Sequence, residues 1–326
     1  LIQRTNFMVE YYGEYDLLVR VAWLYYEEGL TQDQIAQRFN LSRSKVVRIL
    51  KRAREKGIVS FQITGVGSNC LSLEKKLISL FDLEDAMVVP LISEEKVRDT
   101  LGKAAAVYLE RNLKDGELLA IGWGRTIHKI ADHIRGGQFK SLRVVNLMGG
   151  LTTSLFLNPY DIGGRLASLW GGECYYVYAP AIAASEELAR SFKSELTVKT
   201  AMKMAKLADY SLVGIGEVGR ENTLTMMGYI NLPETEILRR NGAVGNILAQ
   251  FFNLRGEKVD CELHKRIVGL SIEELRGLKR VIGVAGGRRK VQSILGALHG
   301  RFINILITDE VTARSIIEKE KESFRS

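Results

Sequence analysis

The chain has 326 residues, of which 46% are hydrophobic and 26% charged, so it is long and apolar enough for about two globular domains and is not disordered. No apolar run approaches the roughly 20 residues of a membrane span, and residues 1–10 do not resemble a secretory signal. We therefore expect a cytoplasmic protein without a membrane partner, and the net charge of +8 favours a polyanionic partner.

The cysteines and histidines are scattered along the chain. The cysteines are Cys70, Cys174 and Cys261, and the histidines are His128, His133, His264 and His299. No CxxC motif or Cys/His cluster occurs among them, so the sequence predicts free thiols, no metal site and no cofactor.

The segment 16–57 has the pattern of three short helices. Apolar residues at helical spacing occupy 16–28, and Gly29 ends that helix. Residues 31–34 form a capping box for a second helix, which Asn40 closes, and Ser42 begins a third helix that ends at Gly57. This spacing predicts a helix-turn-helix within a DNA-binding domain of residues 1–64, with alternating residues 58–63 as part of a wing.

Positive charge is concentrated on the third of these helices. Residues 38–56 contain eight basic residues and one acidic residue. We expect Arg43 and Ser44 to contact base edges, and Arg48, Lys51 and Arg52 to contact phosphates. The predicted DNA-binding set is Thr31, Gln32, Ser42, Arg43, Ser44, Lys45, Arg48, Lys51 and Arg52.

After a linker of small residues at 65–69 and an amphipathic helix at 71–81, strands and helices alternate along the chain. The predicted strands are 86–90, 118–122, 142–147, 173–177, 210–214, 281–285 and 303–307; the predicted helices are 97–113, 125–134, 161–170, 185–192, 195–208, 289–298 and 310–320. This alternation predicts a Rossmann-like α/β domain over residues 65–326, with a mostly parallel sheet and a ligand site at the carboxyl ends of its strands. Helix 71–81 packs on its own domain or pairs with a second chain.

Glycine and hydroxyl residues follow several of these strands, at 122–126, 149–153, 214–216 and 286–290. Such loops allow the backbone to approach an anion, and Lys290 is a candidate phosphate ligand, unless residues 288–290 are only a solvated basic turn. Residues 214–219 spell GxGxxG, but residues 220–228 lack the helical pattern that dinucleotide binding requires.

Segments 24–36, 120–125, 213–216, 242–245, 283–287 with Lys290, and 297–309 together resemble the SorC family of sugar-responsive regulators. The resemblance implies a winged helix-turn-helix, an effector domain related to sugar-phosphate isomerases, a homodimer or homotetramer, and a phosphorylated sugar or sugar-like effector that alters operator binding. Carried over position by position, it implies an effector site of Gly122, Gly124, Arg125, Thr126, Gly149, Gly150, Thr152, Thr153, Glu217, Gly245, Asn246 and Lys290. Many family members have Asp where this chain has Asn246, and an amide carries no charge, so the effector or its binding differs here.

Two other functions fit part of the pattern. A fold related to isomerases can retain isomerisation, with His128, Asp161, Glu217 and His264 as nominal acid-base residues, although their spacing does not pair them. A DNA-binding oligomer without a ligand is the second alternative. The sequence favours a DNA-binding regulator that is not an enzyme.

Overall fold

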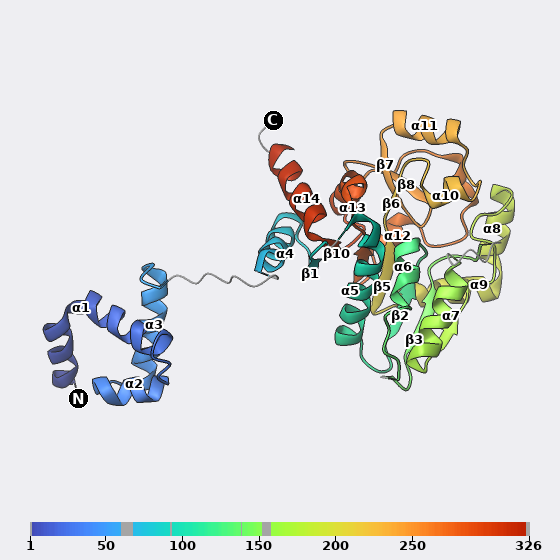
Figure 1. Cartoon of the computed structure of the whole chain (residues 1–326). Coiled ribbons are helices and arrows are strands. Elements are labelled where there is room, and N and C mark those ends of the chain that lie inside the picture. Colours follow the sequence, from blue (N-terminus) through green and yellow to red (C-terminus); the bar gives the residue numbers. More distant parts are fainter. Residues whose placement is uncertain (1, 60–67, 92, 138, 152–157, 324–326) are drawn as a thin grey trace. The chain divides into compact units, whose positions relative to one another are not determined.

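The computed structural model describes residues 2–59, 68–91, 93–137, 139–151 and 158–323 (Figure 1). The chain divides into two compact units, Leu1–Gly65 and Val66–Ser326. No helix among the described residues is both long enough and apolar enough to span a bilayer.

In the described part of the N-terminal unit, residues 2–59, there are three helices: α1 (Ile2–Tyr26), α2 (Gln32–Phe39) and α3 (Arg43–Glu55). Gly13 breaks the helical path of α1 with φ 64° and ψ 153°, a conformation that glycine adopts without strain. The apolar residues that define the predicted pattern, including Val21, Ile35, Val46 and Ile49, are buried in one core. The predicted helix-turn-helix is therefore present.

The predicted caps are present too. Thr31 and Gln34 form a reciprocal capping box at the start of α2, and Asn40 ends the helix at φ 51°, in the left-handed region that Asn tolerates. Ser42 accepts a hydrogen bond from the Lys45 N–H at the start of α3. Of the predicted wing, Ile58 and Val59 pack against the helical core, whereas residues 60–63 lie outside the described residues.

The C-terminal unit contains a seven-stranded parallel sheet in the order β1-β10-β9-β5-β2-β3-β4. Its strands are β1 (Asp85–Val89), β2 (Leu118–Ile121), β3 (Arg143–Asn146), β4 (Glu173–Tyr175), β5 (Tyr210–Gly214), β9 (Val281–Val284) and β10 (Ile305–Asp309). Each corresponds to a predicted strand, with ends shifted by up to two residues. The mostly parallel α/β fold is confirmed.

Helices cover both faces of this sheet (Figure 1). On one face lie α5 (Val97–Asn112), α6 (Arg125–Ile130) and α7 (Pro159–Trp170), while α4 (Ser68–Phe81), α9 (Leu196–Lys206), α13 (Val291–His299) and α14 (Glu310–Ser323) contribute to the core of the other. All four residues of β2 are buried, as expected for a parallel strand with both faces covered. Leu73 and Leu77 of α4 are buried within this unit, so they pack on their own domain.

A second, antiparallel sheet of three strands was not predicted. It consists of β6 (Gly216–Glu217), β7 (Ala243–Ile247) and β8 (Gln250–Asn253). Leu248 and Ala249 turn β7 into β8 at φ 49° and 64°, although neither residue signals such a turn in a sequence. Three short helices were also not predicted: α10 (Thr223–Met226), α11 (Leu232–Arg240) and α12 (Ile272–Arg276).

The remaining elements of the described residues are α8 (Glu186–Ser194) and three 3-10 turns, η1 (Glu94–Lys96), η2 (Glu262–Arg266) and η3 (Arg288–Lys290). The helix predicted to begin at 289 starts as η3 and continues as α13. Strand β6 lies within the GxGxxG segment at 214–219, and the four-residue α10 follows that segment in place of the long helix that a dinucleotide fingerprint needs.

Candidate functional site

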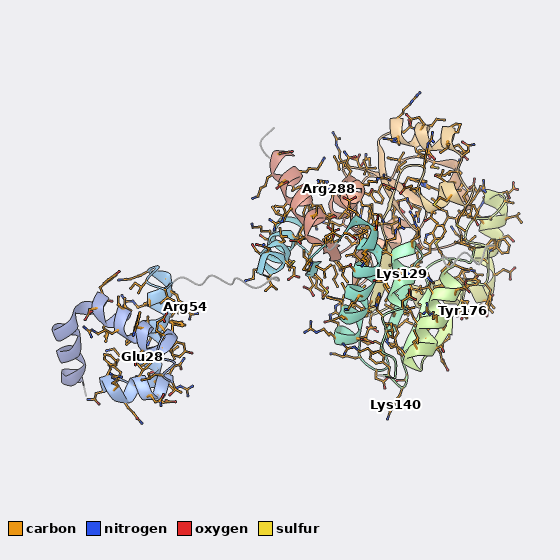
Figure 2. The ribbon with its side chains drawn as sticks, viewed as in Figure 1. Glu28, Arg54, Lys129, Lys140, Tyr176 and Arg288 are labelled. Atoms are coloured by element: carbon orange, nitrogen blue, oxygen red, sulfur yellow. The ribbon has the colours of Figure 1, made fainter. Side chains whose placement is uncertain are left out.

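The outer face of α3 presents the predicted DNA-contacting residues to solvent. Arg43, Ser44, Arg48, Lys51 and Arg52 are exposed, whereas Lys45 is half-buried. Arg54 on the same helix is also exposed (Figure 2). An exposed row of cations on the third helix of a helix-turn-helix is suited to the phosphates and base edges of a major groove.

Several of these side chains already have local partners. Arg43 donates to Gln32 Oε1 at 3.4 Å and lies 3.8 Å from Asp33, which fixes it beside the start of α2. Lys51 lies 3.8 Å from Glu55, and Arg52 pairs with Glu14 of α1. Exposed pairs of this kind contribute little stability, so a DNA phosphate can replace the carboxylate.

Thr31 and Ser42 cap the N-termini of α2 and α3, in addition to any contact with DNA. Each hydroxyl oxygen accepts a backbone N–H at the start of its helix. Ser42 Oγ also lies 3.0 Å from Ser44 Oγ. Removing either capping hydroxyl would therefore disturb the helix as well as a DNA contact.

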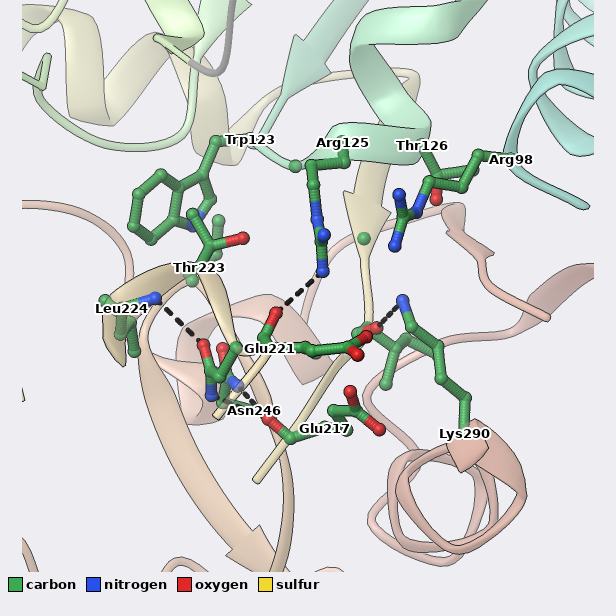
Figure 3. A pocket seen from close by; sticks show the side chains of 16 residues that line it. Arg98, Trp123, Arg125, Thr126, Glu217, Glu221, Thr223, Leu224, Asn246 and Lys290 are labelled. Carbon is green, nitrogen blue, oxygen red and sulfur yellow. Dashed lines mark hydrogen bonds between the residues drawn. The ribbon is translucent and has the colours of Figure 1, made fainter. Parts of the chain in front are cut away.

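A second candidate site is a cavity at the carboxyl ends of β2 and β5, bordered by the small sheet (Figure 3). Six predicted effector residues line it: Gly124, Arg125, Thr126, Glu217, Asn246 and Lys290. Trp123 and residues 214–216, which belong to the predicted strand-end loops, also line it. The lining further includes residues that the sequence did not single out, namely Arg98, Glu221, Asn222, Thr223, Leu224 and Leu248. Its volume is about 60 Å³. Sites for small molecules are usually roughly 300–1,000 Å³, so a sugar phosphate requires this cavity to widen.

Lys290 and Arg125 reach into the cavity and donate to backbone carbonyl oxygens. Lys290 Nζ lies 2.6 Å from the oxygen of Ile215, and Arg125 Nη2 lies 2.7 Å from the oxygen of Glu221 (Figure 3). Desolvation lowers the pKa of Lys290 to about 8; nearby Glu217 opposes this shift, and the positive charges of Arg125 and Arg98 add to it. An anion placed here would stabilise the charged ammonium.

Glu217 and Asn246 lie across from these cations. The small sheet pairs Gly216 with Asn246, which positions the amide against β6, and Asn246 Nδ2 lies 3.4 Å from the carbonyl oxygen of Glu217. Asn222 Nδ2 donates to the same oxygen at 2.6 Å. The two side-chain amides thus hold the backbone of Glu217 in place. The Glu217 carboxylate can accept hydrogen bonds from ligand hydroxyls, and the Asn246 amide can both donate and accept.

Four other predicted effector residues lie outside this cavity. Gly122, Gly149 and Gly150 donate their N–H groups to the carbonyl oxygens of Leu212, Val268 and Ala179 respectively. Gly245 packs so closely that a Cβ there would lie 2.8 Å from Ser293 Cβ. Thr152 and Thr153 lie outside the described residues.

The loop before Lys290 differs from the expected phosphate cradle. The Gly287 N–H donates to Asp309 and Thr312, both at 2.8 Å, so this donor is already engaged within the protein. Arg288 and Arg289 are exposed and pair with Glu94 and Glu221. Of the three basic residues, only Lys290 lines the cavity.

The nominal acid-base residues do not converge. Glu217 lines the cavity, whereas His128, Asp161 and His264 do not. His264 Nε2 accepts the Phe251 N–H at 2.9 Å, and burial lowers the pKa of His264 to about 4. Within the described ranges, no group of three or more His, Cys, Asp or Glu residues is arranged to hold a metal ion.

Each of the two units matches a known protein family. Residues 67–318 match the family "Putative sugar-binding domain", and residues 21–56 match the family "Sigma-70, region 4". The transcriptional regulator LsrR of Enterobacter sp. is 38% identical over 309 residues, which cover 93% of each chain. The erythritol catabolism regulatory protein EryD of Brucella abortus is 34% identical over 304 residues, covering 92% of this chain and 96% of EryD.

The fold also matches a full-length regulator. The crystal structure of the sorbitol operon regulator SorC from Klebsiella pneumoniae superimposes with a TM-score of 0.72 at 28% identity, covering 92% of this chain and 98% of SorC. The match extends over the helix-turn-helix and the α/β unit. The chain therefore belongs to the SorC family of transcriptional regulators, in which a helix-turn-helix precedes a sugar-binding domain.

Proposed function

We propose that the protein binds operator DNA through α3 and that a phosphorylated sugar or sugar-like effector, bound in the cavity, changes its affinity for DNA. The observation that carries the effector assignment is the convergence of Arg125 and Lys290 with the Glu217 carboxylate in one cavity. The cations suit a phosphate, and the carboxylate suits hydroxyl groups. The names of EryD and SorC, which refer to erythritol and sorbitol, agree with a sugar-like ligand.

The proposed effector residues are Gly124, Arg125, Thr126, Glu217, Asn246 and Lys290. Arg125 and Lys290 donate to neutral carbonyl oxygens of the chain itself. Those bonds already have a charged donor, and a phosphate adds a negatively charged acceptor, so its Coulomb attraction to the two cations exceeds that of a neutral carbonyl. A phosphate can therefore replace the carbonyl partners, and the side chains that fill the cavity must shift to admit the sugar.

We further propose a homodimer or homotetramer. One helix-turn-helix covers a half-site, so two copies match an operator with approximate two-fold symmetry and half-sites separated by whole helical turns. Since the operator lies on a bacterial chromosome, the assembly works in the cytoplasm. Light scattering that detects only monomer at micromolar concentration, with and without DNA, would exclude this assembly.

We also propose that the protein is not an enzyme. Isomerisation of a sugar phosphate needs a proton donor and acceptor within hydrogen-bond reach of the substrate. The residues that line the cavity include no histidine, and Glu221 is engaged by Arg289 at 2.8 Å. Incubation of the purified chain with aldose and ketose phosphates should yield no product, and turnover of any of them would contradict the proposal.

The effector assignment can be tested by measuring thermal unfolding of the full chain with a panel of sugar phosphates and their unphosphorylated counterparts. A ligand at about one hundred times its dissociation constant stabilises the native state by about 2.7 kcal/mol. We expect at least one phosphorylated compound to raise the unfolding temperature and its unphosphorylated counterpart to have little effect. Equal stabilisation by both would contradict a phosphate site.

A further inference from the structure

Arg98 is a third cation at the cavity, and no feature of the sequence distinguishes it. It lies in the first turn of α5, far along the chain from the glycine-rich loops, and lines the cavity with Arg125 and Lys290. Figure 3 shows its guanidinium group directed toward the space that Lys290 enters. The chain thus brings three basic side chains, from α5, α6 and η3, to one small volume.

Arg98 differs from the other two cations in its partners. Arg125 and Lys290 donate to the Glu221 and Ile215 carbonyl oxygens, whereas the described part of the chain supplies no hydrogen-bond acceptor or ion-pair partner to Arg98. Its charge lowers the pKa of both Arg125 and Lys290, after the larger effect of desolvation. The three charges therefore repel one another, and a bound anion would relieve that repulsion.

The charges that line the cavity indicate which anion fits. Two carboxylates, those of Glu217 and Glu221, accompany the three cations. Glu221 interacts electrostatically with Arg98 and Arg125, and it also pairs with a fourth cation, Arg289, which lies outside the lining. Four cations against two carboxylates leave a surplus of two positive charges. A phosphate monoester carries close to two negative charges at neutral pH, because its second pKa is about 6.

We propose that Arg98 binds the effector phosphate together with Arg125 and Lys290, and that it makes the site prefer a doubly charged over a singly charged phosphate group. This inference rests on the proposed function, because it assumes that the cavity holds the phosphate. Within the described residues Arg98 has no protein partner, so it exchanges only water for the phosphate. Exposed on the cavity rim, it contributes less than the desolvated Lys290 does.

The test is calorimetric titration of the full chain with inorganic phosphate at pH 7.5 and 5.5, on either side of the second pKa of phosphate. Arg98→Gln should weaken binding about three-fold to ten-fold at pH 7.5, and Arg98→Lys should restore part of the loss. The preference for pH 7.5 over pH 5.5 should also shrink in Arg98→Gln. Arg288→Gln is the matched control, because Arg288 is an exposed arginine that lies outside the lining and pairs with Glu94 at 3.5 Å (Figure 2).

The outcomes separate this inference from the proposal on which it rests. Wild-type binding of phosphate with no loss in Arg98→Gln would overturn the role of Arg98 and leave the phosphate site intact. Equal weakening by Arg98→Gln and Arg288→Gln would also overturn it, because the effect would then be one of overall charge. No saturable binding of phosphate by the wild type would overturn the phosphate site itself.

Discussion

Basic side chains serve both candidate sites, but the two regions hold them differently. On α3 the cations follow one another along a single exposed helix, where water and salt screen them. In the cavity, Arg98, Arg125 and Lys290 come from three distant segments, and desolvation alters the pKa of the last two. The first arrangement suits a long polyanion, and the second suits one small dianion.

The largest effect should follow from Lys290→Ala. Charge-assisted hydrogen bonds contribute about 1.5–3 kcal/mol each, so this variant should bind a phosphorylated effector about ten-fold to one hundred-fold more weakly. Operator affinity without effector should hardly change, because α3 is untouched. Calorimetry and DNA binding measured on one preparation would check both parts. Equal effector binding by variant and wild type would remove Lys290 from the site.

Arg43→Ala should cost about 1–3 kcal/mol of operator binding and relax specificity at one base position. Lys51→Ala should instead weaken all DNA sequences alike and reduce by about one the slope of log affinity against log salt. Titration of specific and random duplexes at several salt concentrations separates the two effects. If Arg43→Ala binds both duplexes as the wild type does, α3 is not oriented as we propose.

Raising the pH should weaken effector binding but not the arginine contacts of α3, because arginine stays protonated. The pKa of Lys290 is lowered to about 8, so the free protein loses this charge above pH 8. Affinity should therefore fall by up to about ten-fold per pH unit above that value. Lys290→Met, which cannot be charged, should abolish this dependence.

The same lysine makes folding stability depend on pH in a defined direction. Between pH 8 and 10.5 the unfolded chain retains the proton that native Lys290 has lost, so the free energy of unfolding should rise with pH. Denaturant unfolding of wild type and Lys290→Met across this range isolates the contribution. The free energy of unfolding of the wild type minus that of Lys290→Met should rise with pH. A difference that stays constant or falls would contradict the buried environment assigned to Lys290.

The smallest predicted effect is that of a helix cap. Ser42 Oγ accepts the Lys45 N–H, whereas Ser44 lies inside α3 with its hydroxyl beside Ser42. Ser42→Ala should destabilise the N-terminal unit by about 1 kcal/mol, and Ser44→Ala should cost clearly less. Urea unfolding of the two variants compares their losses of stability. Equal losses would show that the cap at Ser42 is not the cause of the destabilisation.

The two regions also differ in how far the sequence predicts them. Residues 31–42 carry their own caps and turn, so local chemistry was enough to place α2, α3 and the exposed cations. The strands β2, β3, β5 and β9 were predicted as apolar runs before glycine-rich loops, and β1, β4 and β10 were predicted from the alternation of strands with helices. The small sheet was not predicted, since β6 has two residues, and Leu248 and Ala249 adopt a turn conformation that only their tertiary setting imposes.

The cavity lining was predicted only in part for a related reason. Arg125 and Lys290 follow glycine-rich strand ends, where a ligand is expected. Arg98 does not follow a glycine-rich strand end, and it reaches the cavity because α5 packs against α6. Glu221 and Asn222 likewise enter the lining through the path of the chain between β6 and α10, and a single sequence does not reveal that path.

The most direct test of effector-controlled DNA binding is fluorescence anisotropy on a duplex that the purified chain selects from a random library. Affinity is measured with sugar phosphates and with their unphosphorylated counterparts, for the wild type and for Lys290→Ala. We predict that at least one sugar phosphate changes wild-type affinity about ten-fold or more, that its unphosphorylated counterpart does not, and that Lys290→Ala binds the duplex but responds weakly. An unphosphorylated sugar that acts equally well, or an undiminished response in Lys290→Ala, would contradict the account.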